Sequence, residues 1–505
     1  MRKTSVFSGI VLALTIGLLL PSSSATAAAN IGDIQITDAV ENEIMFDQAV
    51  RLANIDVDTA DGVVTLSGTV NNLLAKRRAA RLAESVKGVT AVINRIDVAP
   101  AAQRPAEEIR ADVNNALLLD PATKSYNVDV AVSDGTVALD GTVQSWQERQ
   151  LAEKVAAGVR GVTAVRNDLE VNYQADRPDG DIRNDIQEAL RWDTLVDHGL
   201  IDVSVDDGEV TLTGTVGSAA EKSRAITDAW VANVTDMDAT GLKVELWARD
   251  PSMREGKYAD LSDETIRNAL IRALARDPRV YSFNVRPEVD GGVVTLRGKV
   301  DNLKARRAAA EVARSTVGVH SVNNRVKVRT AADAARSDEA IEADIRAALT
   351  RDPFVDRFEI VVDSIGGVVS LAGTVDSYYE KSRADDVASR VDGVITVDNN
   401  LMVTDQLDPY AYNPYVDDTY VYDYDWYDYQ PAYTFETDAE ILDDIRGELF
   451  WSPFVDSDEV TVMVEDGVAT LTGTVDSWSE YQAARENAYE GGATWVDNNL
   501  TVQGR

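Results

Sequence analysis

Two short clusters of lysine and arginine are the residues in this chain best suited to bind a ligand. They lie in the stretches 71–86 and 301–317 and consist of Lys76, Arg77, Arg78, Arg81, Lys304, Arg306, Arg307 and Arg314. Grouped cations attract anionic lipid by on the order of 1 kcal/mol each. We therefore expect these side chains to contact anionic phospholipid. Three alternatives stay open: a solvated helix face, a face that pairs with acidic parts of the same chain, and a protein or polyanion partner.

The residue types needed for most catalytic and metal sites are missing or scattered. There is no cysteine, and the two histidines, His198 and His320, occupy unrelated positions. The sequence has no Gly-x-Ser-x-Gly elbow, no phosphate-binding Gly-x-x-x-x-Gly-Lys loop and no His-Glu-x-x-His pair. We therefore predict that the chain is not an enzyme and that it has no catalytic residue, no cofactor and no metal site.

The chain is strongly acidic, which makes the basic clusters unusual. Its 505 residues include 49 lysines and arginines against 85 aspartates and glutamates, a net charge of −36. Such a charge favours solubility and opposes nonspecific binding to nucleic acid or to an anionic membrane by the chain as a whole. We expect no nucleic-acid partner.

The basic clusters lie within a motif that recurs six times. An Asp-Gly or Gly-Gly turn is followed by a strand-like Val-Thr-Leu segment and a glycine, as in 61–70. We call this residue the marker glycine and expect a structural role for it, at a bulge or a close backbone approach. The marker glycines are Gly68, Gly141, Gly214, Gly298, Gly373 and Gly473.

The spacing around each marker glycine predicts five elements. An isoleucine 32 residues before it begins an apolar pattern of helical period, as in Ile109, Val113 and Leu117. Two strands then flank the turn, a second helix follows, and a last strand begins after a glycine such as Gly161. We predict an α+β fold: six small αββαβ domains in tandem, each a three-stranded sheet with two helices on one face.

These domains, here called repeats 1 to 6, form two related halves. We place them at 33–99, 105–172, 179–247, 262–328, 337–404 and 436–503. The basic stretches occupy the same position in repeats 1 and 4, and 249–261 links the halves. A duplicated block of three repeats explains this pattern.

Two further segments differ from the repeats. Residues 1–27 combine Arg2 and Lys3 with an apolar run of about 15 residues, which predicts a cleaved signal peptide rather than an uncleaved anchor. The mature chain is expected to have no transmembrane span. The segment 405–435 is rich in tyrosine and aspartate and has no lysine, arginine or glycine. It is interpreted as an acidic linker, with a partner-binding surface as an alternative; a calcium site is disfavoured because the loop lacks glycine.

The motif resembles the BON domain, the family of OsmY-like periplasmic proteins and of some outer-membrane lipoproteins. The resemblance rests on Asp-Gly-Val-Val-Thr-Leu-x-Gly-x-Val, the following helix, and Gly-Val-x-x-Val-x-Asn at 88–94. It implies a non-enzymatic, periplasmic, multivalent binding or protective protein of the cell envelope, linked to osmotic or envelope stress and able to bind phospholipid. Secretion from the cell stays open. The alternative function is a chaperone-like or structural envelope protein that binds other proteins through 405–435.

Overall fold

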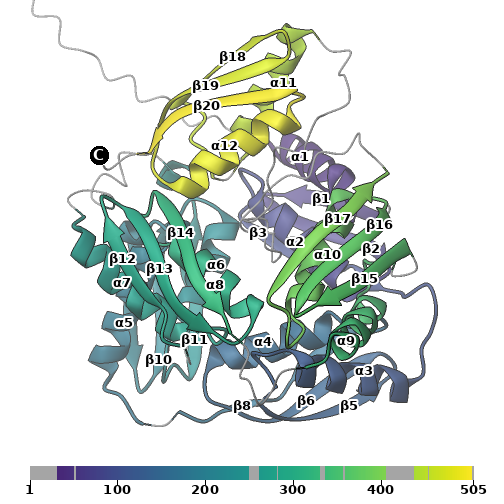
Figure 1. Ribbon diagram of the computed structural model, residues 1–505. Helices are drawn as coiled ribbons and strands as arrows, with labels where there is room; N and C mark the ends of the chain where they lie inside the picture. Colours follow the sequence, from purple (N-terminus) through teal and green to yellow (C-terminus); the bar gives the residue numbers. More distant parts are fainter. Residues whose placement is uncertain are drawn as a thin grey trace, which may run out of the picture. The chain divides into compact units, whose positions relative to one another are not determined.

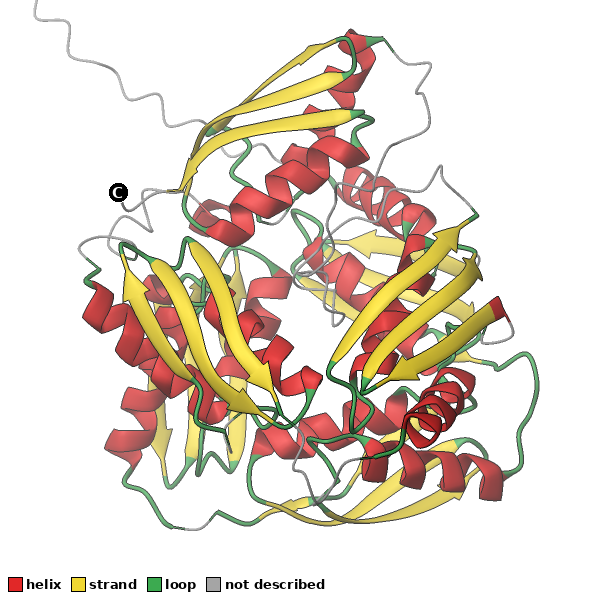
Figure 2. Cartoon of the chain, in the orientation of Figure 1, coloured by secondary structure: helices red, strands yellow, loops and turns green. Residues whose placement is uncertain are grey.

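The six repeats are the units of the fold (Figures 1 and 2). The computed structural model describes residues 31–50, 53–124, 126–173, 175–249, 257, 261–280, 283–329, 336–356, 359–404, 437–452 and 454–502. The expected signal peptide, the tyrosine- and aspartate-rich segment and most of the linker lie outside these residues.

Each repeat has the predicted order of helix, strand, strand, helix and strand, which confirms the α+β class. The first helices are α1 (Asp33–Phe46), α3 (Ala106–Leu119), α5 (Asp179–Trp192), α7 (Asp263–Arg276), α9 (Asp338–Arg351) and α11 (Asp438–Trp451). The second helices are α2 (Leu73–Ser85), α4 (Trp146–Ala157), α6 (Ala219–Ala229), α8 (Leu303–Arg314), α10 (Tyr378–Ser389) and α12 (Trp478–Glu490).

The strand that ends near the marker glycine is the centre of every sheet. It pairs antiparallel with the strand before it and parallel with the strand after the second helix. The first strands are β1 (Asn54–Ala60), β5 (Asn127–Ser133), β9 (Ile201–Asp206), β12 (Arg286–Asp290), β15 (Ile360–Ile365) and β18 (Val460–Glu465). The central strands are β2 (Val63–Val70), β6 (Thr136–Val143), β10 (Glu209–Val216), β13 (Val293–Val300), β16 (Val368–Val375) and β19 (Val468–Val475).

The last strand is continuous in four repeats and broken in two. The continuous strands are β11 (Asp236–Val244), β14 (Ser321–Val328), β17 (Thr396–Val403) and β20 (Trp495–Val502). Repeats 1 and 2 instead have the pairs β3 (Ala91–Asn94) and β4 (Asp97–Val98), and β7 (Ala164–Asn167) and β8 (Glu170–Val171). Two short 3₁₀ helices, His198–Leu200 and Leu246–Arg249, complete the described elements.

The apolar core of each repeat lies between its sheet and its two helices. In repeat 1, Ile36 and Val40 of α1 meet Val64 and Leu66 of β2, and all four are almost fully buried. Alternate residues of β2 point away from this core, as the period of a strand requires. One face of each sheet is therefore covered by helices and the other is turned outward (Figure 2).

The marker glycines lie where two backbones meet. Gly68 has φ +113°, and a Cβ atom there would overlap the carbonyl oxygen of Asn54 on the neighbouring strand. Gly473 has φ +135° and the same relation to Glu459. A side chain at these positions would strain the backbone and separate the strands, which accounts for glycine at this position.

The second helices are all capped by a polar side chain. Asn72 accepts a hydrogen bond from the backbone N–H of Ala75, and Asn302 accepts the same bond from Ala305. In the other four repeats a serine accepts this hydrogen bond, and a glutamate occupies the position of Ala75 and Ala305. Glu480, for example, accepts from the N–H groups of Asp456 and Asp476. The basic helices α2 and α8 lack this glutamate, so the repeats with basic helices are also built differently at the helix start.

Candidate functional site

Two cations of helix α2, Arg77 and Arg78, contact other repeats. The Arg78 Nε donates a hydrogen bond of 2.6 Å to Asp47 Oδ2, and its guanidinium lies 4.8 Å from the ring centre of Tyr379 in repeat 5. Arg77 pairs with Glu153 of repeat 2 at 2.6 Å. Lys76 and Arg81 are partly buried. Helix α2 therefore joins repeat 1 to repeats 2 and 5.

Helix α8 has the same role in the second half. Lys304 Nζ donates to Asp120 Oδ2 of repeat 2 at 2.6 Å, and Arg307 pairs with Asp385 of repeat 5. Arg314 lies 5.8 Å from the ring centre of Trp478 in repeat 6, and Arg306 is partly buried. Burial lowers the pKa of Lys304, and Asp120 opposes that shift by stabilising the charged ammonium.

Three of the eight predicted lipid-binding side chains are therefore enclosed between repeats. The side chains of Arg78, Lys304 and Arg307 are 7, 9 and 8% exposed. A lipid headgroup could reach them only if the repeats separated. Their surroundings fit the alternative in which the basic helices pair with acidic parts of the same chain. Lipid contact stays a prediction for the partly buried cations of both helices, Lys76, Arg77, Arg81, Arg306 and Arg314.

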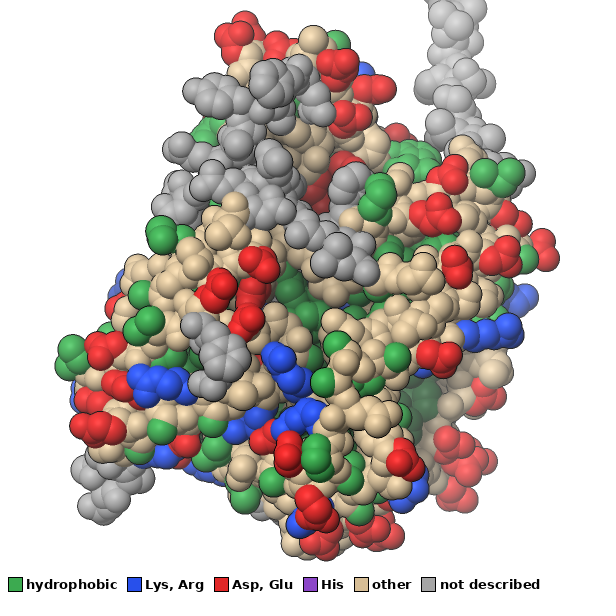
Figure 3. Space-filling model, turned by 90° about the vertical axis from the view of Figure 1, so that its right-hand side faces the viewer, with side chains coloured by type: hydrophobic (Ala, Val, Ile, Leu, Met, Phe, Trp, Pro, Cys, Tyr) green, Lys and Arg blue, Asp and Glu red, His purple; other side chains and the backbone are tan. Residues whose placement is uncertain are grey.

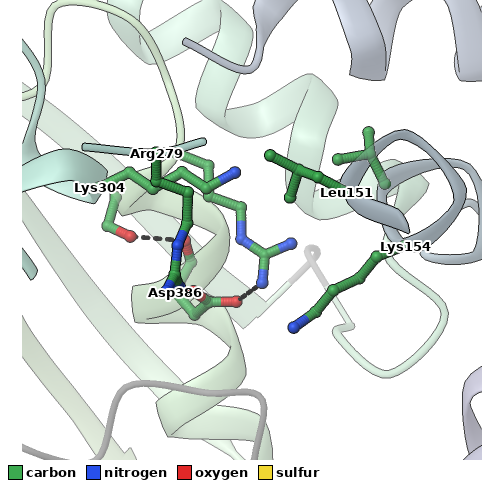
Figure 4. A pocket seen from close by; sticks show the side chains of 8 residues that line it. Leu151, Lys154, Arg279, Lys304 and Asp386 are labelled. Atoms are coloured by element: carbon green, nitrogen blue, oxygen red, sulfur yellow. Dashed lines mark hydrogen bonds and ion pairs between the residues drawn. The ribbon is translucent and has the colours of Figure 1, made fainter. Parts of the chain in front are cut away.

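Repeats 2, 4 and 5 meet around a small pocket (Figure 4). It has a volume of about 30 Å³ and is lined by Leu151, Lys154, Val155, Arg279, Lys304, Asp386, Ser389 and Arg390. That volume holds about two water molecules and is far smaller than the pockets that hold cofactors or substrates. Three of its cations have carboxylate partners: Lys304 pairs with Asp120, Arg390 with Asp386, and Arg279 with Asp277 and Glu311. The pocket is a small junction between three repeats, in which most cations are paired with carboxylates.

The described part of the chain contains no cluster of three or more histidine, aspartate or glutamate side chains that could hold a metal ion. None of its helices is both long and apolar enough to cross a membrane.

Comparison with known families accounts for the repeats. The BON domain pattern matches this chain six times, at residues 32–100, 105–173, 178–239, 262–330, 337–405 and 437–504. The chain belongs to the BON domain family. The expectation drawn from the repeated motif is thereby confirmed.

Two curated BON proteins resemble part of the chain. Osmotically-inducible protein Y of Escherichia coli (strain K12) is 34% identical over 172 residues, which cover 33% of this chain and 82% of that protein. Outer membrane lipoprotein DolP of Haemophilus influenzae is 29% identical over 145 residues, 28% of this chain and 75% of that protein. A solved structure of CdsD, a structural protein of the type III secretion system of Chlamydia trachomatis, covers 45% of this chain at 13% identity and a TM-score of 0.13, which is too low to support an argument.

The contacts between BON repeats recur at equivalent positions, which the sequence alone did not reveal. The residue five positions after each marker glycine touches another repeat of its own half. Leu73 enters the core of repeat 2 and Leu303 that of repeat 5, while Trp146 stacks on Trp230 at 5.3 Å. The other three residues at this position are Ala219 in the core of repeat 1, Tyr378 against the core of repeat 6 and Trp478 beneath Arg314 of repeat 4.

Contacts between the halves also recur. The backbone N–H of Arg160 in repeat 2 donates to the carbonyl of Arg351 in repeat 5 at 2.6 Å. The backbone N–H of Val317 in repeat 4 donates to the carbonyl of Trp192 in repeat 3 at 2.9 Å. Val317 has the same offset from its marker glycine as Arg160, and Trp192 has the same offset as Arg351. Large residues such as Trp146 and Leu303 at a shared offset are a sequence signal for the first set of contacts, whereas the backbone hydrogen bonds between the halves have no side-chain signal.

Proposed function

We propose that this BON-domain protein is a non-enzymatic, periplasmic protein of the cell envelope that binds anionic phospholipid surfaces and acts under osmotic or envelope stress. The names of its relatives, an osmotically inducible protein and an outer membrane lipoprotein, support the setting. The lipid partner rests on the charge of the chain itself.

The observation that carries this proposal is the segregation of charge into repeat 4. Residues 262–330 contain fourteen lysines and arginines against seven aspartates and glutamates, a net charge of +7 in a chain whose total is −36. Repeat 6, at 437–504, contains two against fifteen, a net charge of −13. An anionic membrane would attract the first and repel the second, so the chain would bind in one orientation.

The test is co-sedimentation of the full chain with lipid vesicles. We expect binding to vesicles of phosphatidylglycerol and phosphatidylcholine at low salt, and binding at least about tenfold weaker at 0.5 M salt because the ions screen exposed charges. Vesicles of phosphatidylcholine alone are the control. Equal binding to both vesicle types, or no binding at low salt, would reject the proposal.

The alternative function, a chaperone-like or structural protein that binds other proteins, depends on the segment 405–435. That segment lies outside the described residues, and no described feature favours this function over lipid binding.

A further inference from the structure

The outward face of the sheet in repeat 4 carries a dense group of cations that the basic helices do not include. Arg286, Arg297 and Arg325 are partners across strands β12, β13 and β14, and Lys299 and Lys327 are partners in the next row. All five side chains are exposed. Strand spacing places them within an area of roughly 10 Å by 7 Å. We call these five residues the basic sheet face.

The other repeats do not have this feature. At the position of Lys299 they carry a threonine in every case: Thr69, Thr142, Thr215, Thr374 and Thr474. At the position of Arg286, repeats 1 to 3 carry an aspartate: Asp56, Asp129 and Asp202. The fold therefore needs no cation at either position, because the same sheet forms without one.

The grouping is also unfavourable by itself. Like charges directly opposite each other on a sheet destabilise it. Glu288 pairs with Arg297 at 2.8 Å, and Asn284 accepts a hydrogen bond from Arg286. Within the described ranges, no carboxylate lies within 4 Å of Lys299, Arg325 or Lys327. An external anionic surface would supply the missing counter-charge.

We infer that the basic sheet face is the surface through which the chain docks on an anionic lipid membrane, an inference that rests on the proposed function and names its site. The face suits a membrane because it is an open sheet surface rather than a pocket. Helices α7 and α8 cover the opposite face of this sheet (Figure 1). Its charge is also opposite to the net charge of the chain, which is −36. On the face drawn in Figure 3, acidic side chains are spread widely, with groups of lysine and arginine between them.

The experiment replaces four of these cations by the residues found at the same positions in repeat 6. The variant carries Arg297→Thr, Lys299→Thr, Arg325→Asn and Lys327→Thr. Because Thr472, Thr474, Asn499 and Thr501 occupy these positions in an equivalent sheet, we expect the variant to fold, which circular dichroism melting would verify. The matched control removes four exposed cations from other repeats: Arg110→Gln, Arg166→Gln, Arg183→Gln and Lys243→Gln. Both variants change the net charge equally.

Binding of the full chains to phosphatidylglycerol vesicles at low salt distinguishes the outcomes. We expect the sheet variant to bind at least about a hundredfold more weakly than the unaltered chain, and the control to stay within about threefold. Equal losses in both variants would mean that only total charge matters and would overturn the inference. The inference would also be overturned if the sheet variant bound vesicles as well as the unaltered chain while Lys76→Gln and Arg306→Gln lost binding. That result would assign lipid binding to the basic helices.

Two further results distinguish a failure of the docking surface from a failure of the proposed function. If the unaltered chain does not bind these vesicles, the proposed function fails and the docking surface with it. If the unaltered chain binds and the sheet variant binds equally well, only the docking surface fails. Sedimentation of each protein alone tests whether the face instead binds an acidic face of a second copy. Salt-sensitive self-association that the sheet variant loses, with unchanged vesicle binding, would overturn the inference.

Discussion

Two ion pairs at equivalent positions show how burial changes the role of the same contact. Arg77–Glu153 joins repeats 1 and 2, and Arg307–Asp385 joins repeats 4 and 5, with equal offsets from the marker glycines. The first pair is 31 and 22% exposed, whereas the second is 8 and 6% exposed. Water stabilises the charges of the first pair if one partner is removed. The second pair lacks that access.

We therefore predict different costs for the same substitution. Arg307→Ala leaves Asp385 buried without this partner and should lower the free energy of unfolding by about 3–5 kcal/mol. Arg77→Ala should cost about 1 kcal/mol or less. Chemical denaturation of both variants measures the difference, and the double variant Arg307→Ala with Asp385→Ala should recover part of the loss. Equal costs at both sites would contradict this account.

In five of the six repeats, an asparagine of the last strand ties that strand to the second helix. Asn94 Nδ2 donates to the carbonyl of Lys76 at 2.8 Å, and Asn324 Nδ2 donates to that of Arg306 at 2.7 Å. Repeat 3 has Thr240 near this position, and there Lys222 Nζ donates to the carbonyl of Leu242 at 2.6 Å instead. Helix and strand are linked in both cases, but by side chains from opposite elements.

Two neighbouring asparagines of β14 test this link. Asn324→Ala removes the donor to the Arg306 carbonyl and should lower the free energy of unfolding by about 1–3 kcal/mol. Asn323 lies on the exposed side of the same strand, so Asn323→Ala should change it by less than about 0.5 kcal/mol. Thermal melting of the two variants compares them directly. A similar effect of both would show that the link contributes little.

The elements of each repeat could be predicted from the sequence because their signals are local. The helical spacing of Ile109, Val113 and Leu117 and the turn before each marker glycine lie within about 40 residues of one another. The residues of other repeats that the basic helices contact could not be predicted in this way. Lys304 meets Asp120, which is 184 residues away, and nothing local to either residue identifies the other. The basic sheet face could not be predicted either, because its residues come from three strands and form a group only once the register is known.

At the scale of the whole molecule, the described contacts repeat between the halves. Repeat 2 contacts repeat 5 through Arg160 and Arg351, and repeat 4 contacts repeat 3 through Val317 and Trp192. Repeats 1 and 6 also meet, where Lys87 lies 4.0 Å from the ring centre of Phe450. This recurrence supports a duplicated block of three repeats. It also makes each repeat part of several interfaces, so the stability of a repeat depends on its neighbours.

The contact between repeats 1 and 6 should respond to pH, because it brings carboxylates together. Burial, reinforced by Glu448 and Asp47, raises the pKa of Glu43 to about 8, and Arg78 opposes this shift. Burial and Asp444 raise the pKa of Glu448 to about 7, and burial with Glu448 and Glu43 raises that of Glu490 well above its usual range. In the folded chain these carboxyl groups therefore keep their protons to a higher pH than in the unfolded chain. In the unfolded chain their pKa is the ordinary glutamate value of 4.5.

The stabilising contribution of these protons is therefore complete below pH 4.5 and is lost as the pH rises through about 7 to 8. Glu43→Gln keeps the neutral form at every pH. It should raise the melting temperature by about 2 °C or more at pH 8 and change it little at pH 4.5. Glu41→Gln, on the exposed side of the same helix, is the matched control and should have no such pH-dependent effect. An equal effect of Glu43→Gln at both pH values would mean that the three carboxylates do not share a proton-dependent contact.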